Sequence, residues 1–559
     1  MQRTRSAIVN KCRNIRLRNN ALSLALCVFF STGISRADNP IVQTLYTADP
    51  APMVYNDKVY LYTSHDEDVI ENNFFTMKNY RCYSSSDIVN WTDHGMVATI
   101  QDFKWAGTIG AWAPHGIHRD GKFYLYCPIQ LKGIGVLVSN TPYGPFTDPL
   151  GRPLIKHSSG DIDPTVYIDS DGQAYLYWGN PDLYYVKLNQ DMTSYSGNVT
   201  KVTLTVASFG KRSKTDRPTS YEEGPWLYKR NNLYYMVFAG GPVSEHIGYS
   251  TSNSPVGPWT YGGVIMPTQG ASFTNHPGVI DFKGNSYFFY HNGALTGGGG
   301  YHRSVCVEQF SYSTDGKIPT INMTKNGPNQ VGTLNPYDTV QAETICWESG
   351  VKTEKCSEGG VDVCNIENGD YIKVKGVNFG TGATTFDARV SSANSGGKIE
   401  LRLDSQTGTL VGTCTVTGTG GWQTWATKSC TVTGATGTHD LFLKFTGGSG
   451  SLFNFNWWKF NQPVKTSHSV FRNTITTAKA VVDKESVQLS FPNQIVHENV
   501  NVSLFDLNGR IALTLYKGKL QQNQLIIPLR RNEIQIGTYI LNVSTKKQSL
   551  LEKQVVIKN

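Results

Sequence analysis

The sequence predicts an all-β protein: a five-bladed β-propeller, then a β-sandwich (jelly-roll-like) module and a small C-terminal β-sandwich domain. Three observations support this fold class. An aromatic-rich strand with a turn before it recurs five times within the first 320 of the 559 residues. From about residue 337 the composition shifts to Gly, Thr and Ser with short alternating strands. No segment has a convincing 3.6-residue apolar period, so we expect little helix.

The repeated strands define the predicted propeller, residues 38–325. They read VYLYTS, FYLYCP, AYLYWG, YYMVFAG and YFFYHN, and each follows a turn-forming pair such as Asn56-Asp57. One tyrosine in each strand serves as a marker, and successive markers lie 51 to 64 residues apart: Tyr60, Tyr124, Tyr175, Tyr234 and Tyr287. That spacing is roughly the length of a four-stranded blade with its loops.

A fixed position upstream of each marker holds the residues of chemical interest. Eleven residues before the marker, or twelve in the third repeat, stand Asp49, Ala113, Asp163, Glu223 and His276. We call these positions the upstream slots. The innermost strands of propeller blades run along one channel, so equivalent positions converge there. A single Asp-Pro before a strand is usually a turn device, but three carboxylates and a histidine in equivalent slots favour a reaction site.

Converging carboxylates suggest glycoside hydrolysis, in which one acid protonates the leaving oxygen and another carboxylate activates water or attacks the sugar. Five segments occur in the order TADPAP (47–52), AWAPHG (111–116), GDIDPTVYIDSDG (160–172), YEEGPWLYKR (221–230) and NHPGVIDF (275–282). With these segments the chain resembles glycoside hydrolase family 43.

The resemblance implies an inverting mechanism with a role for each slot carboxylate. Asp49 would be the general base that deprotonates water, and Glu223 the general acid that protonates the glycosidic oxygen. Asp163 would orient Glu223 and raise its pKa by like-charge repulsion. Glu222 is the adjacent rival for the acid. Neighbouring strand side chains face opposite sides, and the family motif places the acid directly before Gly-Pro, which favours Glu223.

Four further side chains are candidates for substrate binding. Trp112, beside the second slot, and Trp178, at the end of the third marker strand, offer flat faces for stacking on sugar rings, although a core position is an equal alternative for Trp178. The resemblance implies that His276 lies at the channel base near an ion or water; a structural histidine is the alternative. Arg303 follows a glycine-rich stretch and is a candidate partner of substrate hydroxyls or a carboxylate.

Residues 337–462 carry a second resemblance. The segments VQAET, VNFGTGATTFDARVSS, IELRLDSQTGTLVGT, GGWQTW and THDLFLKFTGG are similar to a family 6 carbohydrate-binding module. The resemblance implies a sugar ring sandwiched between two aromatics and hydrogen-bonded by an asparagine, at Tyr371, Trp425 and Asn454 here. It also implies a structural calcium on Glu343, whereas Asn456 stands where an aspartate is usual.

The two ends of the chain suggest export. Residues 1–37 have a basic region, an apolar run too short to span a membrane, and small residues at the cleavage positions, as in a signal peptide. Residues 463–480 form a polar linker. Residues 481–559 resemble a C-terminal sorting domain of type IX secretion, with a carbohydrate-binding or adhesive domain as the alternative. We therefore expect a secreted or surface-attached protein.

The charge distribution indicates which binding partners to expect, and the cysteines indicate which disulfides are possible. The formal net charge is +8, but the first 37 residues contain seven basic and no acidic side chains, which leaves 44 basic against 43 acidic groups. A nucleic-acid partner is therefore not expected, nor is a membrane span, and we expect a monomer. Five cysteines crowd into residues 346–430; Cys414 and Cys430 could form one disulfide, and two of Cys346, Cys356 and Cys364 another.

The expected function is removal of pentosyl residues from plant cell-wall hemicellulose, without a cofactor. The favoured activity is that of an α-L-arabinofuranosidase on arabinoxylan, an expectation that rests on the two resemblances. A β-xylosidase, or an endo-acting arabinanase or xylanase of the same family, is the alternative. A non-catalytic glycan-binding protein is the alternative of another class, and the three intact slot carboxylates argue against it.

Overall fold

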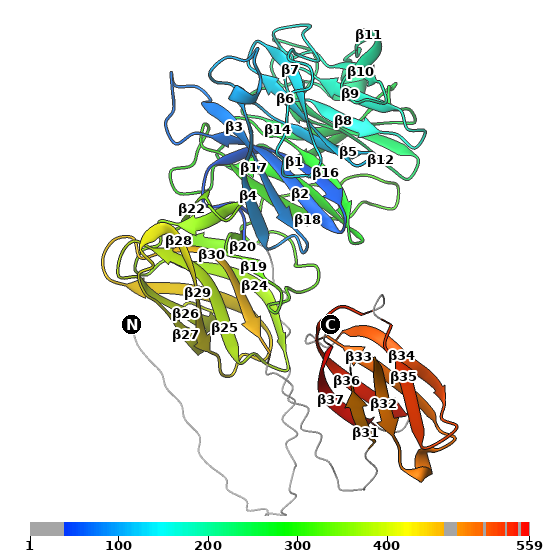
Figure 1. Ribbon diagram of the computed structural model, residues 1–559. Coiled ribbons are helices and arrows are strands. Elements are labelled where there is room, and N and C mark those ends of the chain that lie inside the picture. Colours follow the sequence, from blue (N-terminus) through cyan, green and yellow to red (C-terminus); the bar gives the residue numbers. More distant parts are fainter. Residues whose placement is uncertain are drawn as a thin grey trace, which may run out of the picture. The chain divides into compact units, whose positions relative to one another are not determined.

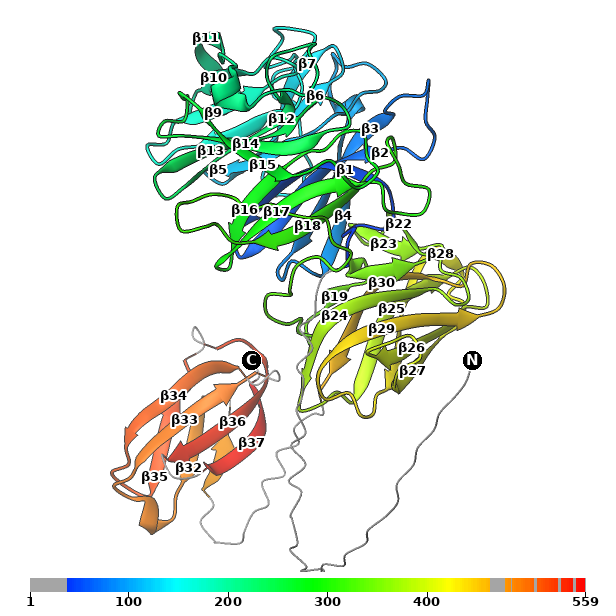
Figure 2. The same cartoon turned by 180° about the vertical axis from the view of Figure 1, so that it is seen from behind.

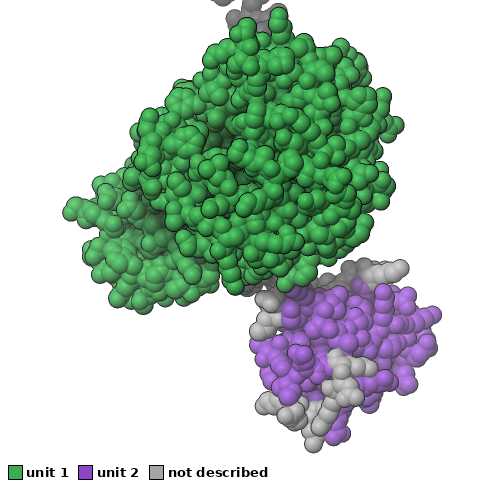
Figure 3. Space-filling model, turned by 90° about the horizontal axis from the view of Figure 1, so that it is seen from above, with its two compact units in different colours: residues 1–463 green, residues 464–559 purple. Residues whose placement is uncertain are grey.

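The computed structural model describes residues 38–462 and 478–557, apart from 484, 507–509, 531–533 and 546–548. The chain divides into two compact units, residues 1–463 and 464–559 (Figure 3). The predicted signal peptide and most of the predicted linker lie outside the described residues. The described part confirms an all-β protein, since its only helices are α1 (Val206–Phe209) and the 3-10 turns η1 (Ile100–Asp102) and η2 (Asn493–Ile495).

Five consecutive antiparallel sheets form the first part of unit 1. The first contains β1 (Thr47–Tyr55), β2 (Lys58–Asp66), β3 (Met77–Ser85) and β4 (Trp91–Thr99), and the second β5 (His115–Arg119), β6 (Lys122–Ile129) and β7 (Gly133–Ser139). The third contains β8 (Thr165–Ile168), β9 (Ala174–Trp178), β10 (Tyr184–Leu188) and β11 (Tyr195–Lys201). The fourth contains β12 (Tyr221–Arg230), β13 (Leu233–Gly240), β14 (His246–Ser252) and β15 (Thr260–Met266), and the fifth β16 (Gly278–Phe282), β17 (Asn285–Asn292) and β18 (Ser304–Phe310).

The first strands of the five sheets form a closed ring. Strand β1 contacts β5, β5 contacts β8, β8 contacts β12, β12 contacts β16, and β16 contacts β1 again (Figures 1 and 2). The aromatic marker strands are the second strands, β2, β6, β9, β13 and β17, and most of their side chains are buried. The segment before β1 also contacts the fifth sheet, because the Ile41 N–H donates to the Val305 carbonyl of β18 at 2.9 Å. The upstream slots therefore lie at or just before equivalent ends of the ring strands.

The second part of unit 1 is a sandwich of two sheets. One contains β22 (Lys352–Lys355), β23 (Val361–Cys364), β30 (Asn454–Asn461), β25 (Thr385–Ser392) and β28 (Gly421–Thr431), with β19 (Val340–Gln341) paired to β30. The other contains β21 (Trp347–Ser349), β24 (Tyr371–Gly380), β29 (Gly437–Gly447), β26 (Gly397–Leu403) and β27 (Leu410–Val416). Both sheets contribute to one apolar core that includes Phe386, Phe445 and Trp458.

The sandwich is joined to the sheet of β1–β4. Strand β20 (Thr344–Ile345) pairs with β4. The buried Asn90 side chain donates to the Lys375 carbonyl at 2.9 Å and accepts from the Lys375 N–H at 2.8 Å. The Thr353 hydroxyl donates to Asp93 at 2.9 Å. These paired polar groups hold the two parts of unit 1 together.

Unit 2 is a small β-sandwich with its own core. One sheet contains β31 (Lys479–Val482), β32 (Ser486–Ser490) and β35 (Gln524–Pro528); the other contains β34 (Ile511–Lys519), β33 (Asn499–Phe505), β36 (Gly537–Thr545) and β37 (Ser549–Ile557). Its core includes Val487, Val502 and Leu541. The role of this unit in sorting stays a prediction.

The cysteines differ from the expectation of two disulfides. All eight cysteines of the described residues are free thiols. Cys414 and Cys430 lie on the neighbouring strands β27 and β28, close enough for a hydrogen bond between their side chains, but they are not bridged. Separately, none of the helices in the described ranges is long and apolar enough to cross a membrane.

Candidate active site

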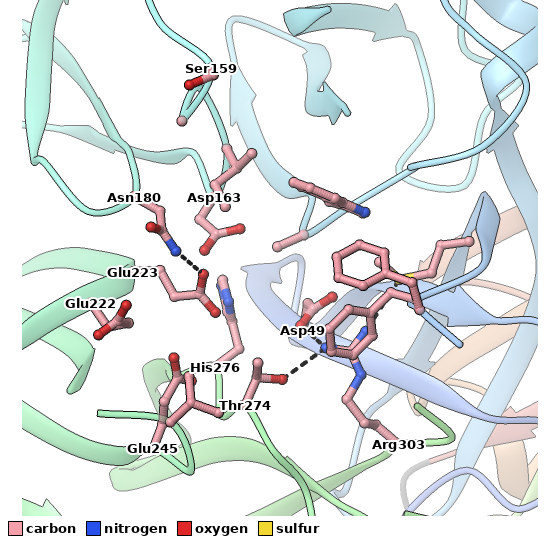
Figure 4. A pocket seen from close by; sticks show the side chains of 18 residues that line it. Asp49, Ser159, Asp163, Asn180, Glu222, Glu223, Glu245, Thr274, His276 and Arg303 are labelled. Carbon is pink, nitrogen blue, oxygen red and sulfur yellow. Dashed lines mark hydrogen bonds and ion pairs between the residues drawn. The ribbon is translucent and has the colours of Figure 1, made fainter. Parts of the chain in front are cut away.

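All five upstream slots line one cavity of about 340 Å³ (Figure 4). The convergence expected from the spacing is therefore present. The lining also includes two aromatic side chains on the loop between β2 and β3 and side chains from every sheet of the ring: Asp49, Phe74, Phe75, Met77, Trp112, Ala113, Ser159, Gly160, Ile162, Asp163, Asn180, Glu222, Glu223, Val243, Glu245, Thr274, His276 and Arg303.

The backbone is irregular at the three upstream slots that hold a carboxylate. Asp49 and Asp163 both have a φ of 56°, in the left-handed region that residues with a side chain rarely adopt. The pairing of β1 with β2 shifts register between Ala48 and Ala51, and that of β12 with β13 shifts on both sides of Glu223. Such bulges re-aim side chains and recur beside active sites. The same local device therefore turns carboxylates into the cavity from separate strands.

Asp49 is held as a carboxylate. It is 5% exposed, accepts a hydrogen bond from the Ser64 hydroxyl at 2.5 Å and pairs with Arg303 at 3.0 Å. Burial alone would raise the pKa of Asp49, but the positive charge of Arg303, the neighbouring histidines and the Ser64 bond together hold that pKa below its ordinary value. An ionised carboxylate in the cavity is suited to accept a proton from water.

Arg303 is fixed by a second carboxylate. Its Nε and Nη2 donate to the two oxygens of the fully buried Asp66 at 2.9 and 2.8 Å, and its Nη1 donates to Asp49 and to the Thr274 hydroxyl. The Phe75 ring lies over the guanidinium, 4.6 Å from ring centre to carbon. Arg303 lines the cavity, as the sequence suggests; the bidentate pair with Asp66 fixes its guanidinium, and Nη1 binds Asp49.

The half-buried Glu223 and the buried Asp163 are two acids that share the cavity. Burial raises the pKa of Glu223 to about 7, with Asp49 adding to the rise and a hydrogen bond from Asn180 at 2.5 Å opposing it. Burial and the charge of Glu223 raise the pKa of Asp163 well above its usual range, while Asp163 accepts from the Gly224 N–H at 3.0 Å. Burial therefore raises the pKa of both acids more than like-charge repulsion does, whereas the sequence predicts like-charge repulsion as the cause.

Glu222 differs from Glu223 in its partners. It forms ion pairs with the side chains of Arg212 and Arg217. The Glu222 carboxylate is thus engaged by two guanidinium groups, whereas that of Glu223 accepts from the Asn180 amide. This contrast supports Glu223 as the acid.

Of the remaining predicted substrate contacts, Trp112 and His276 line the cavity and Trp178 does not. The Trp178 side chain is fully buried, and its indole N–H donates to Asp161 at 2.9 Å, so the prediction of a subsite wall is wrong and the core alternative holds. His276 is buried at the centre of the cavity, and burial lowers its pKa to about 4, which makes it neutral at neutral pH. Figure 4 shows Asp49 on one side of His276 and Glu223 on the other.

Asn180 and Glu245 are two polar side chains of the cavity that the sequence analysis does not name. Asn180, which donates to Glu223, follows the third marker strand by two residues, and that proximity is a signal that could have drawn attention to it. Glu245 lies in the loop before β14, outside the repeated register, and no pattern in the sequence marks it.

The predicted glycan-binding set of the sandwich is not brought together. Tyr371 on β24 and Trp425 on β28 belong to different sheets. Their strand neighbours Ile372 and Ala426 face inward opposite core residues, so both rings project outward, from opposite faces of the sandwich. They cannot enclose one sugar ring. Asn454 lies in the sheet of Trp425, where its amide donates to Glu354 at 2.7 Å and to the Trp422 carbonyl at 3.3 Å.

Comparison with known proteins identifies the family to which the chain belongs. The model for glycosyl hydrolases family 43 matches residues 37–318, and that for the carbohydrate binding module (family 6) matches residues 341–462. The arabinoxylan arabinofuranohydrolase of Bacillus subtilis (strain 168) is 38% identical over 491 residues, which covers 76% of this chain and 92% of that protein. The enzyme of the same name from Paenibacillus polymyxa is 37% identical over 506 residues, covering 79% and 76%.

A solved structure agrees with these relatives. The crystal structure of a family 43 arabinoxylan arabinofuranohydrolase from Bacillus subtilis, in complex with cellotetraose, is similar to this chain with a TM-score of 0.67 and 36% sequence identity. The similarity covers 77% of this chain and 99% of the solved one. It therefore extends over both parts of unit 1.

Proposed function

Because the chain belongs to glycosyl hydrolases family 43, we propose that it is an α-L-arabinofuranosidase that removes arabinosyl groups from arabinoxylan. The observation that carries this proposal is the similarity to arabinoxylan arabinofuranohydrolases across both the catalytic part and the carbohydrate-binding module. The geometry of the cavity agrees with it, since an ionised carboxylate and an acid with a pKa near neutrality line one pocket.

The mechanism follows from the states of the two acids. The oxygen of a water molecule attacks the anomeric carbon of the arabinosyl group while Asp49 takes its proton. The bond from the anomeric carbon to the glycosidic oxygen breaks, and Glu223 gives its proton to that oxygen. One displacement inverts the anomeric configuration, and the two acids regain their starting states by exchange with solvent. No cofactor takes part.

The remaining side chains prepare these two groups. Arg303 and Ser64 keep Asp49 ionised and oriented. Asn180 orients the Glu223 carboxyl, and Asp163 is fixed by the N–H of the residue that follows Glu223. Preorganised donors of this kind cost little rearrangement during the reaction.

Hydrolysis of two aryl glycosides tests the proposal. The purified full chain should hydrolyse 4-nitrophenyl α-L-arabinofuranoside with a higher kcat/KM than 4-nitrophenyl β-D-xylopyranoside, and it should release arabinose from arabinoxylan. NMR of the first-formed sugar should show the inverted anomer. Preference for the xylopyranoside would favour the β-xylosidase alternative, which relatives such as the xylosidase/arabinosidase of Bacteroides ovatus, 33% identical over 49% of this chain, keep open.

We also propose that the five sheets are the blades of a five-bladed propeller. The closed ring β1–β5–β8–β12–β16 supports this, because only sheets arranged around a common axis bring their first strands into such a ring. Export to the cell exterior is a further proposal, supported by the pattern of residues 1–37 and by a polymeric substrate that lies outside cells. The sorting role of unit 2 and a monomeric state remain expectations.

The predicted calcium at Glu343 is only partly supported. Glu343 is 4% exposed and its Oε2 has no partner among the described residues, which is compatible with a cation. However, the described residues gather no three His, Cys, Asp or Glu side chains that could hold a metal, and Asn456 donates its amide to Glu358. The side chains therefore do not form a calcium site on their own. If calcium binds through carbonyl oxygens as well, its addition after EDTA treatment will raise the melting temperature.

A further inference from the structure

Glu245 is a fourth acid of the cavity that the mechanism above does not use. It lies directly before β14 and is 3% exposed. Its backbone N–H donates to the Phe273 carbonyl at 3.1 Å, and its Oε2 accepts from the Asn275 N–H at 2.8 Å. Backbone groups on the opposite loop thus fix both its main chain and one carboxyl oxygen.

The other carboxyl oxygen is unpaired. Among the described residues, Glu245 Oε1 is buried and has no hydrogen-bond partner. A buried polar atom without a partner is costly, and folds rarely retain one without a reason. The residue lines the cavity, and Figure 4 shows it on the same side as Glu222 and Glu223.

Two other acids of the first part of unit 1 are paired, whereas Glu343 Oε2 and Asp362 Oδ1 in the second part also lack a partner among the described residues. Glu308 on β18 is 6% exposed, and both of its oxygens have partners: Asn39, Tyr290 and Thr324 donate to it at 2.7 to 3.0 Å. Glu222 is paired with two arginines. Glu245 has neither type of partner for Oε1, and the cavity is the place from which one could come.

The protonation of Glu245 suits a hydrogen-bond donor. Burial, and then the charge of Glu223, raise the pKa of Glu245 well above its usual range. These effects favour the neutral form of the carboxyl group. In that form, Oε2 accepts from the Asn275 N–H and the proton is on Oε1, the oxygen that has no partner among the described residues of the cavity wall.

We propose that Glu245 is a further substrate-binding residue, whose unpaired Oε1 forms a hydrogen bond with one hydroxyl group of the arabinofuranosyl ring in the pocket. The identity of the ring rests on the proposed function. The loop of Glu245 and the acid Glu223 come from the same sheet, β12–β15, so this bond would fix the ring relative to the proton donor.

Deoxy sugars test the proposal directly. The substrates are 4-nitrophenyl α-L-arabinofuranoside and its 2-, 3- and 5-deoxy analogues. Glu245→Ala should lower kcat/KM on the parent roughly 10- to 100-fold, the typical effect of one such hydrogen bond. The wild type should hydrolyse each analogue with a lower kcat/KM than the parent. For one analogue this difference in kcat/KM should disappear in Glu245→Ala, and for the other analogues it should stay as large as in the wild type. Glu245→Gln, whose amide can donate in place of the neutral carboxyl, should stay within about three-fold of the wild type on the parent.

Glu308→Gln is the matched control, since it removes an equally buried carboxyl group away from the cavity. It should leave kcat/KM unchanged on all four substrates even if the melting temperature falls. The proposal is overturned if Glu245→Ala keeps the wild-type kcat/KM, or if Glu245→Gln loses as much kcat/KM as Glu245→Ala. It is also overturned if the kcat/KM of Glu245→Ala falls on every analogue by the same factor as that of the wild type. Failure of the wild type to hydrolyse the parent would instead overturn the proposed function, and the same series on the β-D-xylopyranoside would then decide the role of Glu245.

Discussion

At the residue scale, two carboxyl groups of one pocket have opposite pKa shifts. Asp49 lies beside Arg303 and accepts from Ser64, so its pKa is lowered; Glu223 accepts from the neutral Asn180 amide, and burial raises its pKa to about 7. Pairs of acids whose environments separate their pKa values mark acid and base roles. The base and acid assigned here follow from those environments.

Replacement of the acid should depend on the leaving group. Glu223→Gln cannot donate a proton, so we expect kcat on arabinoxylan to fall roughly 10²- to 10⁴-fold. The loss should be much smaller on an aryl arabinofuranoside, whose leaving group needs little protonation. Glu222→Gln is the adjacent control and should stay active. If Glu222→Gln showed the leaving-group dependence and Glu223→Gln did not, the acid would be Glu222.

The pH profile of kcat/KM should be bell-shaped. Glu223 must be protonated, so activity is present below about pH 7 and is lost as the pH rises through that value. Asp49 must be ionised, so activity is lost as the pH falls through its lowered pKa. Ser64→Ala removes the hydrogen bond to Asp49, which raises the pKa of Asp49 and moves only the acidic limb, toward higher pH. A shift of the basic limb instead would contradict these assignments.

At the scale of the element, the loop before β8 forms one wall of the pocket and is held by a buried carboxylate. Asp161 accepts from the backbone N–H groups of His157 and Ser158 and from the Trp178 indole. Ser159 and Gly160 of this loop line the cavity. Trp178 thus affects the substrate through the loop, without touching it.

Removal of the indole N–H should therefore loosen the wall. Trp178→Phe leaves a buried Asp161 oxygen without this donor, and we expect a loss of about 1–3 kcal/mol in unfolding free energy. KM should rise more than kcat falls, because the acid and base are not displaced. Urea denaturation and steady-state kinetics on the aryl arabinofuranoside would measure both effects. A large fall in kcat at unchanged KM would contradict the indirect role.

At the scale of the whole molecule, removal of unit 2 should leave the stability and activity of unit 1 unchanged. Unit 2 has its own core, so a chain ending at residue 462 should keep the melting temperature of unit 1 and its kcat/KM on the aryl arabinofuranoside. Calorimetry of the full chain should then show a separate transition for unit 2. A lower melting temperature of the shortened chain would show that the units stabilise each other.

Removal of the sandwich of unit 1 should, in contrast, lower the stability of the remaining part. A chain ending at residue 336 leaves β4 without its partner β20 and the buried Asn90 without Lys375. Exposed strand edges and unpaired buried amides destabilise folds, so we expect a lower melting temperature and aggregation. Asn90→Ala in the full chain is the milder test, and it should lower the melting temperature of unit 1 without changing KM on the aryl substrate.

The success of sequence reasoning differed between the two parts of unit 1. In the first part, each slot follows from a repeat, and a residue at a repeated position meets its equivalents wherever the repeats close on a common axis. In the sandwich, Tyr371 and Trp425 were assigned by similarity of segments alone. Which sheet each strand joins depends on tertiary pairing: β24 pairs with β21 and β29, whereas β28 pairs with β25, so the two rings lie in different sheets.

The sequence by itself determined the all-β character, the five aromatic strands and the slot residues Asp49, Asp163 and Glu223, because these depend on local periodicity and spacing. Only the tertiary structure decided which polar atoms meet: Arg303 with Asp66 and Asp49, Asn180 with Glu223, Trp178 with Asp161, and Glu245 Oε2 with the Asn275 N–H. Those contacts join residues far apart in the chain, and burial, which sets the pKa of Glu223, arises only when the sheets pack together.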